Sequence, residues 1–176
     1  MFSQSNCTIV KAIKPVLLLV AFSLLMVHCM PAKTTAERST QTLRIKKLLK
    51  SRMYQFIPQS VQTQTGRSFP VNSFSLVLDK DSMISYLPYF GTAYSAPFGA
   101  SKGPLDFTTT GFSYSIEAGK KGQTFVNIQL KNGAYDAQEF YFNVNPDGYA
   151  TLNVRFNNRQ SISFYGQIGK IPEKRK

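Results

Sequence analysis

Residues 112–164 read FSYSIEAGKKGQTFVNIQLKNGAYDAQEFYFNVNPDGYATLNVRFNNRQSISF, and this stretch indicates the fold most strongly. Apolar and polar residues alternate in five successive segments of it, which is the period of a strand with one buried face. Short runs containing Lys, Asn, Asp or Gly separate the segments, and these residues favour tight hairpin turns. The stretch therefore predicts consecutive strands that each pair with their neighbour in an antiparallel meander.

The same alternation continues toward the start of the predicted β-domain, residues 52–169. Tyr54 and Phe56 open one strand, and residues 74–78 and 84–87 form two more. About eight strands with one apolar face each close most economically into a barrel, because closure removes exposed edges. We therefore predict an all-β antiparallel meander forming an up-and-down, lipocalin-like barrel. A two-sheet sandwich is the alternative.

Residues 1–29 have the organisation of a signal sequence. Lys11 and Lys14 precede an apolar run at residues 15–27. This run is shorter than the roughly 20 residues that a transmembrane helix needs, but it suits the core of a signal sequence. We expect export to the periplasm or the outer membrane.

Both cysteines of the chain, Cys7 and Cys29, lie in or beside this segment. Cys29 closely follows the apolar run in a context that partly resembles a lipobox, so Cys29 is a candidate lipidation residue. Ordinary cleavage near Cys29 or Ala32, giving a soluble protein, is the alternative. In either case we expect a mature domain without a disulfide, and its size allows an apolar core to hold it together.

Positive charge is concentrated outside the predicted domain. The formal net charge is +12, from 21 Lys and Arg against 9 Asp and Glu. Residues 33–52 hold seven of these basic residues against one acid, Glu37, and the tail at residues 170–176 is also basic. The remaining domain is nearly neutral and carries no nucleic-acid-binding motif, so we expect no nucleic-acid partner.

Residues 30–51 are predicted to form a basic linker and a helix. Leu43, Leu48 and Leu49 lie among basic residues, and no Gly or Pro interrupts residues 36–50. We expect this helix to act as a stalk outside the core. Its basic residues either rest on an anionic membrane surface or form a solvated face.

Few residues in the chain suit catalysis. The single histidine, His28, lies at the border of the predicted signal sequence, and the mature domain has no cysteine. This composition excludes Ser-His and Cys-His nucleophilic catalysis and any zinc site that uses histidine. We expect no cofactor and no bound metal.

Carboxylates are the remaining candidates for chemistry. A hydrolase using a carboxylate pair stays open as an alternative, although turn and surface roles explain these residues better. The candidates for such a pair are Asp79, Asp81, Asp106, Glu117, Asp136 and Glu139. Residues 143–148 resemble the first half of a calcium loop, but Val154 occupies the position where that loop needs a bidentate Glu. We therefore interpret residues 143–148 as a hairpin turn.

The connection at residues 85–99, SYLPYFGTAYSAPFG, is long and rich in aromatic residues. Long ordered loops in compact domains are usually functional or packed against the core. The loop therefore either forms a binding mouth for a small apolar or glycan ligand or caps one end of the barrel. The candidate binding residues are Tyr86, Tyr89, Phe90, Tyr94 and Phe98. Gly91 and Gly99 are expected to adopt backbone conformations that a side chain would forbid.

Three segments also resemble a known family. The family is the domain-of-unknown-function 4251 family of small exported Bacteroidota proteins. Its recurrent segments are similar, in the same order along the chain, to residues 51–56, 86–99 and 157–166. The resemblance spans about residues 51–168. It implies an envelope location and a β-barrel-like domain, but no reaction and no catalytic residues.

These observations favour a non-enzymatic protein of the cell envelope whose barrel binds a small apolar, glycan or lipid ligand. A lipid anchor or the basic segment would bring the protein to a membrane surface. The first alternative is a structural or accessory subunit of an envelope complex, with the aromatic loop buried against a protein partner. The second is a carboxylate-dependent hydrolase.

Overall fold

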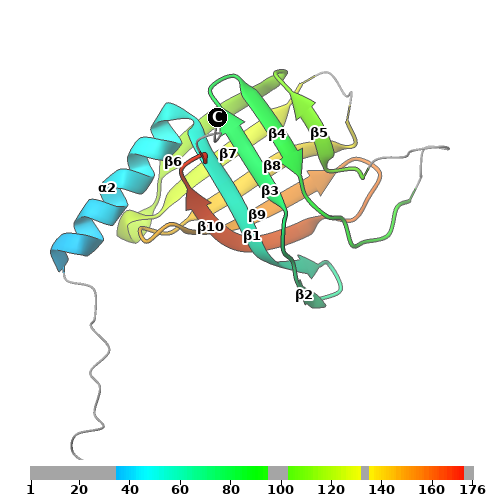
Figure 1. Cartoon of the computed structure of the whole chain (residues 1–176). Coiled ribbons are helices and arrows are strands. Elements are labelled where there is room, and N and C mark those ends of the chain that lie inside the picture. Colours follow the sequence, from blue (N-terminus) through cyan, green and yellow to red (C-terminus); the bar gives the residue numbers. More distant parts are fainter. Residues whose placement is uncertain (1–34, 95–102, 132–134, 173–176) are drawn as a thin grey trace, which may run out of the picture. The chain divides into compact units, whose positions relative to one another are not determined.

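The computed structural model describes residues 35–94, 103–131 and 135–172, which form one α-helix packed on an antiparallel sheet (Figure 1). The helix is α2 (Thr35–Ser51), and a short 3-10 helix, η1 (Lys120–Gly122), joins two strands. The strands are β1 (Met53–Thr63), β2 (Ser68–Pro70), β3 (Ser75–Asp79), β4 (Ser82–Tyr86), β5 (Asp106–Thr109), β6 (Phe112–Ala118), β7 (Thr124–Leu130), β8 (Ala137–Val144), β9 (Tyr149–Phe156) and β10 (Ile162–Gly169).

The ten strands form one nearly closed, barrel-like sheet in the order β5-β4-β3-β1-β10-β9-β8-β7-β6, with β2 paired to β1 off this path. The four hairpins from β6 to β10 pair as the sequence predicts. The first and last strands close the barrel, with Phe56 opposite Ile168. In the described residues, no ladder joins β5 to β6, so the seam of the barrel lies between two strands that are neighbours in the chain.

The eight strands predicted from the alternation are all present, and the structure adds β2 and β5. β2 has three residues, all exposed, and β5 has four. Neither is long enough to show a buried face in its residue pattern, so period-two alternation cannot reveal them. Their pairing with β1 and β4 places them in the sheet.

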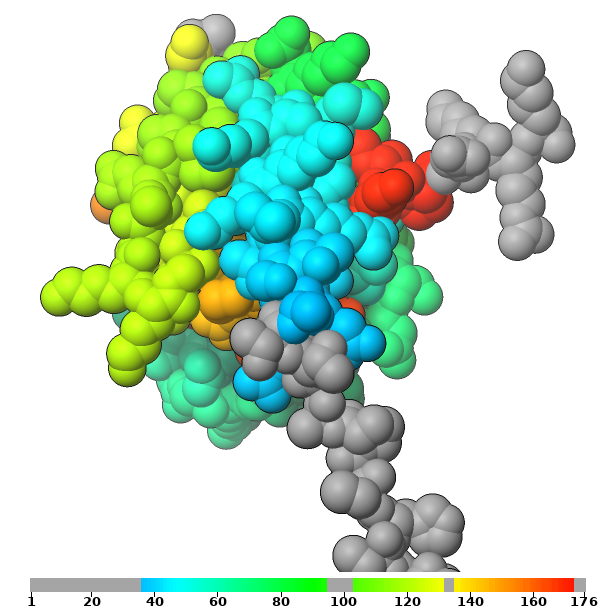
Figure 2. All heavy atoms as spheres, turned by 90° about the vertical axis from the view of Figure 1, so that its left-hand side faces the viewer, coloured from blue at the N-terminus to red at the C-terminus, as the bar shows by residue number. Residues whose placement is uncertain are grey.

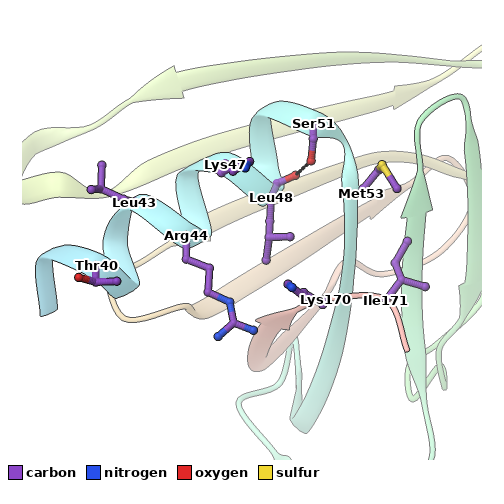
Figure 3. Close-up of a pocket in the computed structure, with 9 residues that line it drawn as sticks. All are labelled: Thr40, Leu43, Arg44, Lys47, Leu48, Ser51, Met53, Lys170 and Ile171. Carbon is purple, nitrogen blue, oxygen red and sulfur yellow. Dashed lines mark hydrogen bonds between the residues drawn. The ribbon is translucent and has the colours of Figure 1, made fainter. Parts of the chain in front are cut away.

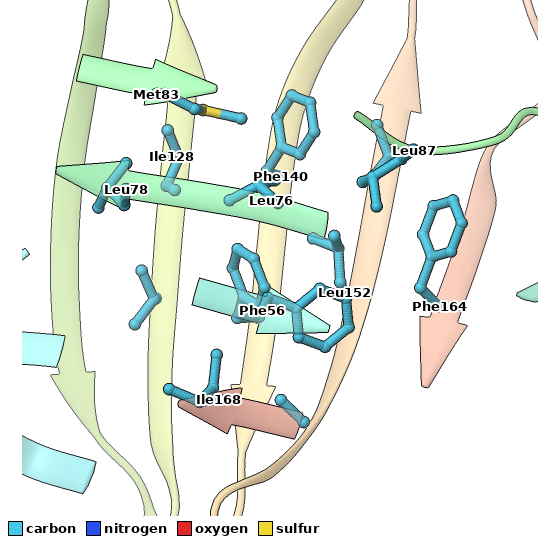
Figure 4. Close-up of a cluster of buried hydrophobic side chains, with 14 of the residues drawn as sticks. Phe56, Leu76, Leu78, Met83, Leu87, Ile128, Phe140, Leu152, Phe164 and Ile168 are labelled. Atoms are coloured by element: carbon cyan, nitrogen blue, oxygen red, sulfur yellow. The ribbon is translucent and has the colours of Figure 1, made fainter. Parts of the chain in front are cut away.

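Large apolar side chains fill the inside of the barrel (Figure 4). Alternate residues of each strand point inward, as the burial pattern of β8 shows. The Phe142 ring packs edge-on against Phe56, with centroids 5.4 Å apart, and against Tyr54 at 6.3 Å. These contacts make the interior a packed core that supports the surfaces at both ends.

Helix α2 belongs to this core, so the expectation that it forms a stalk was wrong. Ile45 and Leu49 are buried among the barrel side chains, whereas Leu43 is 69% exposed. The Thr42 hydroxyl also donates a hydrogen bond of 3.2 Å to the carbonyl of Pro146 in the β8–β9 turn. Basic residues surround Ile45 and Leu49 in the sequence, so the composition of the segment does not indicate that one face of the helix is buried.

Strands β1 and β10 approach each other closely at Gly166. A Cβ atom at this position would overlap the carbonyl oxygen of Ile57 and lie 2.7 Å from Cα of Pro58. The pairing register shifts between Pro58 and Ser60, which marks a bulge in β1. Only glycine fits where the strands that close the barrel meet.

Candidate functional site

Tyr89 anchors the aromatic loop to the barrel. Its ring packs edge-on against Phe156, with centroids 5.1 Å apart, and its hydroxyl donates hydrogen bonds to the carbonyls of Gln160 at 3.0 Å and Thr92 at 3.2 Å. Burial raises the pKa of the Tyr89 hydroxyl, and the nearby Arg159 guanidinium partly offsets this shift. Tyr89 therefore has the role of a cap on this end of the barrel.

A polar network holds the β9–β10 turn on the other side of Tyr89. The Arg159 guanidinium lies over the Tyr89 ring, 5.5 Å from its centroid, and forms an ion pair of 2.7 Å with Asp136. Both charged side chains are largely buried, at 14% and 18% exposure, so the pair is well shielded from water. Asp136 also accepts a hydrogen bond of 2.9 Å from the amide of Asn158.

The other predicted site residues do not converge on a single cavity. Tyr86 is half exposed and packs against Phe74 at a centroid distance of 5.2 Å, on the outer side of the sheet. Tyr94 is 69% exposed. Phe98 and Gly99 lie outside the described residues. A role of these residues in ligand binding stays a prediction, and Phe90 lines one cleft among the described residues.

This cleft lies between the tip of the β1–β2 hairpin and the aromatic loop, and we call it the Phe69–Phe90 cleft. It has a volume of about 490 Å³. The Phe69 and Phe90 rings form a pair with centroids 5.6 Å apart, and each side chain is about 40% exposed. The other lining residues are Thr63, Thr65, Arg67, Gly91, Thr92 and Gln160.

Backbone and side-chain hydrogen bonds make the walls of the cleft rigid. In the hairpin, the Thr63 amide donates to the carbonyl of Arg67 at 2.9 Å, and Gly66 adopts the positive φ of 82° that this tight turn requires. Across the cleft, the backbone amide of Gln160 donates a hydrogen bond of 3.2 Å to the backbone carbonyl of Thr92. The two loops are therefore held in position before a ligand arrives.

Gly91 completes the wall, but for a reason that the sequence did not indicate. Its φ lies outside the left-handed region. A Cβ atom there would instead lie 2.6 Å from the hydroxyl oxygen of Tyr89. Glycine is needed because the hydrogen-bonded Tyr89 hydroxyl occupies the space of a side chain.

Carboxylates are absent from the lining of the Phe69–Phe90 cleft. Asp136 pairs with Arg159, and Glu139 pairs with Arg155 at 3.0 Å and accepts a hydrogen bond from Asn127 at 2.9 Å. Asp79, Asp81, Asp106 and Glu117 lie on or next to β3, β4, β5 and β6. Within the described ranges, no group of three or more His, Cys, Asp or Glu side chains could hold a metal ion.

The calcium-like residues 143–148 form the β8–β9 hairpin turn. The Asn145 amide donates to the carbonyl of Tyr149 at 2.8 Å, and Gly148 has a positive φ of 93°. The oxygen of the Asn145 side chain accepts a hydrogen bond from the Gln123 amide group at 3.3 Å, and the Asp147 carboxylate accepts one from the Tyr149 amide. The Asn145 and Asp147 oxygens thus have partners, Gln123 before β7 and Tyr149 in the hairpin, whereas the buried side-chain oxygen of Asn143 has none among the described residues.

A second hollow, which we call the α2 groove, lies at the opposite end of the barrel. It runs beside the helix and has a volume of about 720 Å³ (Figure 3). Its lining residues are Thr40, Leu43, Arg44, Lys47, Leu48, Ser51, Met53, Lys170 and Ile171. Apolar side chains thus meet three cations in one open groove. No helix in the described part of the chain is long and apolar enough to cross a membrane.

Sequence reasoning missed most residues of both hollows. Phe69 and Arg67 lie around a three-residue strand that shows no alternation, and Gln160 lies far from Phe90 in the chain. Met53 and Lys170 join the α2 groove only because β1 pairs with β10. The aromatic loop pointed to Phe90 and Gly91 of the cleft, and the basic segment at residues 30–51 pointed to Leu43 and Leu48 of the α2 groove.

Comparisons with known proteins identify the family and the fold. The family model described as "Domain of unknown function (DUF4251)" matches residues 36–168. A crystal structure of a DUF4251 family protein from Bacteroides eggerthii superposes with a TM-score of 0.56 at 13% sequence identity, covering 78% of this chain and 92% of that one. No curated protein matches this chain. At this level of identity, the structural neighbour supports the barrel fold alone.

Proposed function

Because this chain belongs to the DUF4251 family, whose description names no activity, we propose from the geometry that it is a non-enzymatic binding protein of the cell envelope that holds a saccharide in the Phe69–Phe90 cleft. One observation carries this proposal. Two aromatic rings, each about 40% exposed, lie beside hydroxyl, guanidinium and amide groups on rigid loops.

The chemistry of the lining favours a saccharide over a purely apolar ligand. The C–H face of a sugar ring is apolar and stacks on an aromatic ring, which offers a large contact area at little cost in rotamer entropy. Sugar hydroxyls both donate and accept hydrogen bonds, as Thr65, Thr92 and Gln160 do. An apolar ligand would instead remove the Arg67 guanidinium and the Gln160 side chain from water without offering them a hydrogen bond.

The size of the cleft agrees with a small ligand. Ligand pockets commonly have volumes of about 300–1,000 Å³, and the Phe69–Phe90 cleft has about 490 Å³. This volume suits one or two sugar rings. The lack of a carboxylate in the lining favours retention of the saccharide without cleavage.

Titration of a panel of envelope and host glycans by NMR or calorimetry tests the proposal. We expect saturable binding that Phe90→Ala weakens at least ten-fold. Tyr86→Ala is the matched control, because Tyr86 is half exposed in the preceding strand and lies outside the cleft. Absence of binding across the panel, or an equal loss in both variants, would overturn the saccharide proposal.

The envelope location is proposed from residues 1–29, where two lysines precede an apolar run. Mass spectrometry of the mature protein tests it. We expect an N-terminus at or near Cys29 or Ala32, and acylated Cys29 if the lipobox-like context is used. A mature protein that keeps Met1 would contradict export.

A further inference from the structure

The outward face of α2 carries one exposed apolar side chain among several cations. Ile45 and Leu49 turn toward the barrel, and the helical repeat of 100° per residue places Leu43, Lys47 and Lys50 on the opposite side. Leu43 is 69% exposed. Figure 2 looks onto this end of the molecule, with α2 (blue to cyan) across the middle of the face.

Hollows flank Leu43 on both sides of the helix. The α2 groove lies on one side, and a second hollow, lined by Leu43, Lys46, Lys47, Lys50 and Ser51, lies on the other. Leu43 therefore stands on a ridge with lysines on either side. In Figure 3, Arg44 and Lys170 flank the groove, and Leu48, Met53 and Ile171 supply its apolar surface.

Within the described residues, no acidic side chain neutralises the positive charge of this face. No ion pair in the described part of the chain involves Arg44, Lys46, Lys47, Lys50 or Lys170. The nearest pair past the helix end, Arg52 with Asp81, is long at 3.9 Å and exposed. The single acidic residue of α2, Glu37, lies in the first turn, away from these cations.

We propose that this face of α2 docks the protein on the surface of an anionic lipid bilayer. Lipid phosphates would meet the cations, and Leu43 and Met53 would enter the boundary between headgroups and acyl chains. The apolar face of α2 is already buried in the barrel, so the cations would supply most of the attraction and Leu43 would add one apolar contact. Each Lys or Arg near an anionic surface strengthens such binding.

A bilayer is the occupant that the charges and apolar groups favour together. A nucleic acid would use the cations but would leave Leu43, Met53 and Ile171 without an apolar partner. The predicted lipidation residue Cys29 also precedes α2 by only a short segment. One acyl chain binds a membrane only weakly, and a basic surface beside it is the usual second contribution.

Docking through α2 would set the orientation of the barrel. Met53 lines the α2 groove at the start of β1, and Thr63 lines the Phe69–Phe90 cleft at its end. At about 3.3 Å per residue, this strand spans roughly 30 Å. The cleft would therefore face away from the membrane, where it could reach a soluble or surface-bound ligand.

Vesicle sedimentation of the mature chain carrying Cys29→Ser, which removes any acyl anchor, tests this proposal. We expect binding to mixed phosphatidylcholine–phosphatidylglycerol vesicles, little binding to phosphatidylcholine alone, and weakening by salt. Lys47→Glu should weaken binding at least ten-fold. Lys131→Glu is the matched control, because it makes the same charge change on an exposed residue at the other end of the barrel, after β7.

Leu43→Ser should also weaken binding, because it removes the apolar side chain and keeps every charge. Circular dichroism verifies that each variant is folded, and Lys47→Gln replaces Lys47→Glu if charge reversal disturbs the helix. Equal binding to neutral vesicles, no vesicle binding, or an equal loss in Lys131→Glu would overturn the proposal. The Lys47→Glu variant should bind saccharide with unchanged affinity. Failure of the membrane-docking proposal is therefore distinguishable from failure of the saccharide proposal.

Discussion

The two ends of the barrel are held together by different forces. At one end, α2 is fixed by apolar side chains, with Ile45 and Leu49 buried in the core. At the other end, the aromatic loop is fixed by polar contacts, namely the Tyr89 hydroxyl bonds and the Asp136–Arg159 pair. Both segments cover the same core, but the balance differs. Hydrogen bonds of Thr42 and Tyr114 accompany the apolar contacts of α2, whereas Leu87 and the Tyr89 ring accompany the polar contacts of the loop.

This difference decides what each end leaves exposed. The helix uses its apolar residues inward, so its outer face is basic. The loop turns Leu87, the Tyr89 ring and polar groups inward, and Phe90 and Tyr94 stay partly exposed. One end therefore suits an anionic surface, and the other suits an uncharged ligand with apolar and polar faces.

The largest expected effect is at Gly166, where β10 pairs with β1 between the two ends of the barrel. Gly166→Ala should destabilise the protein by about 3 kcal/mol or more, because its Cβ would overlap the Ile57 carbonyl in the backbone of β1. Denaturant unfolding measures this. Gly169→Ala is the matched control in the same strand, since no atom lies within 4 Å of its Cβ. Equal stability of the two variants would contradict the close approach.

The next prediction compares the stability lost on truncating a residue on the inner face of α2 with that lost on its outer face. Leu49→Ala should cost about 2–5 kcal/mol, because it leaves a cavity in the core. Leu43→Ala should change stability by no more than about 0.5 kcal/mol, because Leu43 is 69% exposed. Denaturant midpoints of the pair measure the difference. A larger loss in Leu43→Ala would show that the helix is packed in another orientation.

At the loop end, Tyr89 and Tyr94 provide the corresponding pair. Tyr89→Ala should cost about 2–3 kcal/mol, because it removes the ring contact with Phe156 and the hydrogen bond to Gln160. Tyr94→Ala should cost at most about 0.5 kcal/mol, since Tyr94 is 69% exposed. Thermal unfolding distinguishes them. If both variants were equally stable, Tyr89 would not act as a cap.

Alkaline pH should weaken the contact between the helix end and β6. The Tyr114 hydroxyl donates a hydrogen bond of 2.8 Å to the carbonyl of Leu49, and burial raises the pKa of Tyr114 to about 12. Burial also raises the pKa of Tyr54, so both hydroxyls act in the same direction. Below pH 10 they are neutral in the folded and unfolded states, and their contribution to stability is fully present.

Between about pH 10 and 12, the unfolded chain ionises first, so the free energy of unfolding should fall by on the order of 2 kcal/mol for Tyr114. Denaturant unfolding across this range measures the slope. Tyr114→Phe should reduce the slope, whereas Tyr86→Phe, at a half-exposed residue, should leave it unchanged. A slope that Tyr114→Phe does not alter would contradict this assignment.

The smallest expected effect concerns the β8–β9 turn on which α2 rests. The oxygens of Asn145 and Asp147 already have hydrogen-bond partners, so calcium or a chelator should leave the unfolding temperature unchanged. Calorimetric scans with calcium and with a chelator measure this. A rise of several degrees with calcium would show that the turn binds the ion.

The sequence by itself determined the strands whose side chains alternate and the hairpins that join them. Residues 112–164 specify their neighbours locally, because a tight turn forces adjacent strands to pair. The same locality explains why residues 143–148 could be predicted to form a hairpin turn. The resemblance of three segments to one family was also readable from residues alone.

Only the tertiary structure decided which residues meet across the barrel. Pairing of β1 with β10 brings Met53 near Lys170, and the short strand β2 brings Phe69 to Phe90. It also decided that Ile45, and not Leu43, is buried. The first contacts join segments that are far apart in the chain. The last concerns which face of α2 packs on the barrel, in a helix whose basic residues are spread around its circumference. Local periodicity carries no information about contacts between distant segments, although the i, i+4 spacing of Ile45 and Leu49 does place them on one helix face.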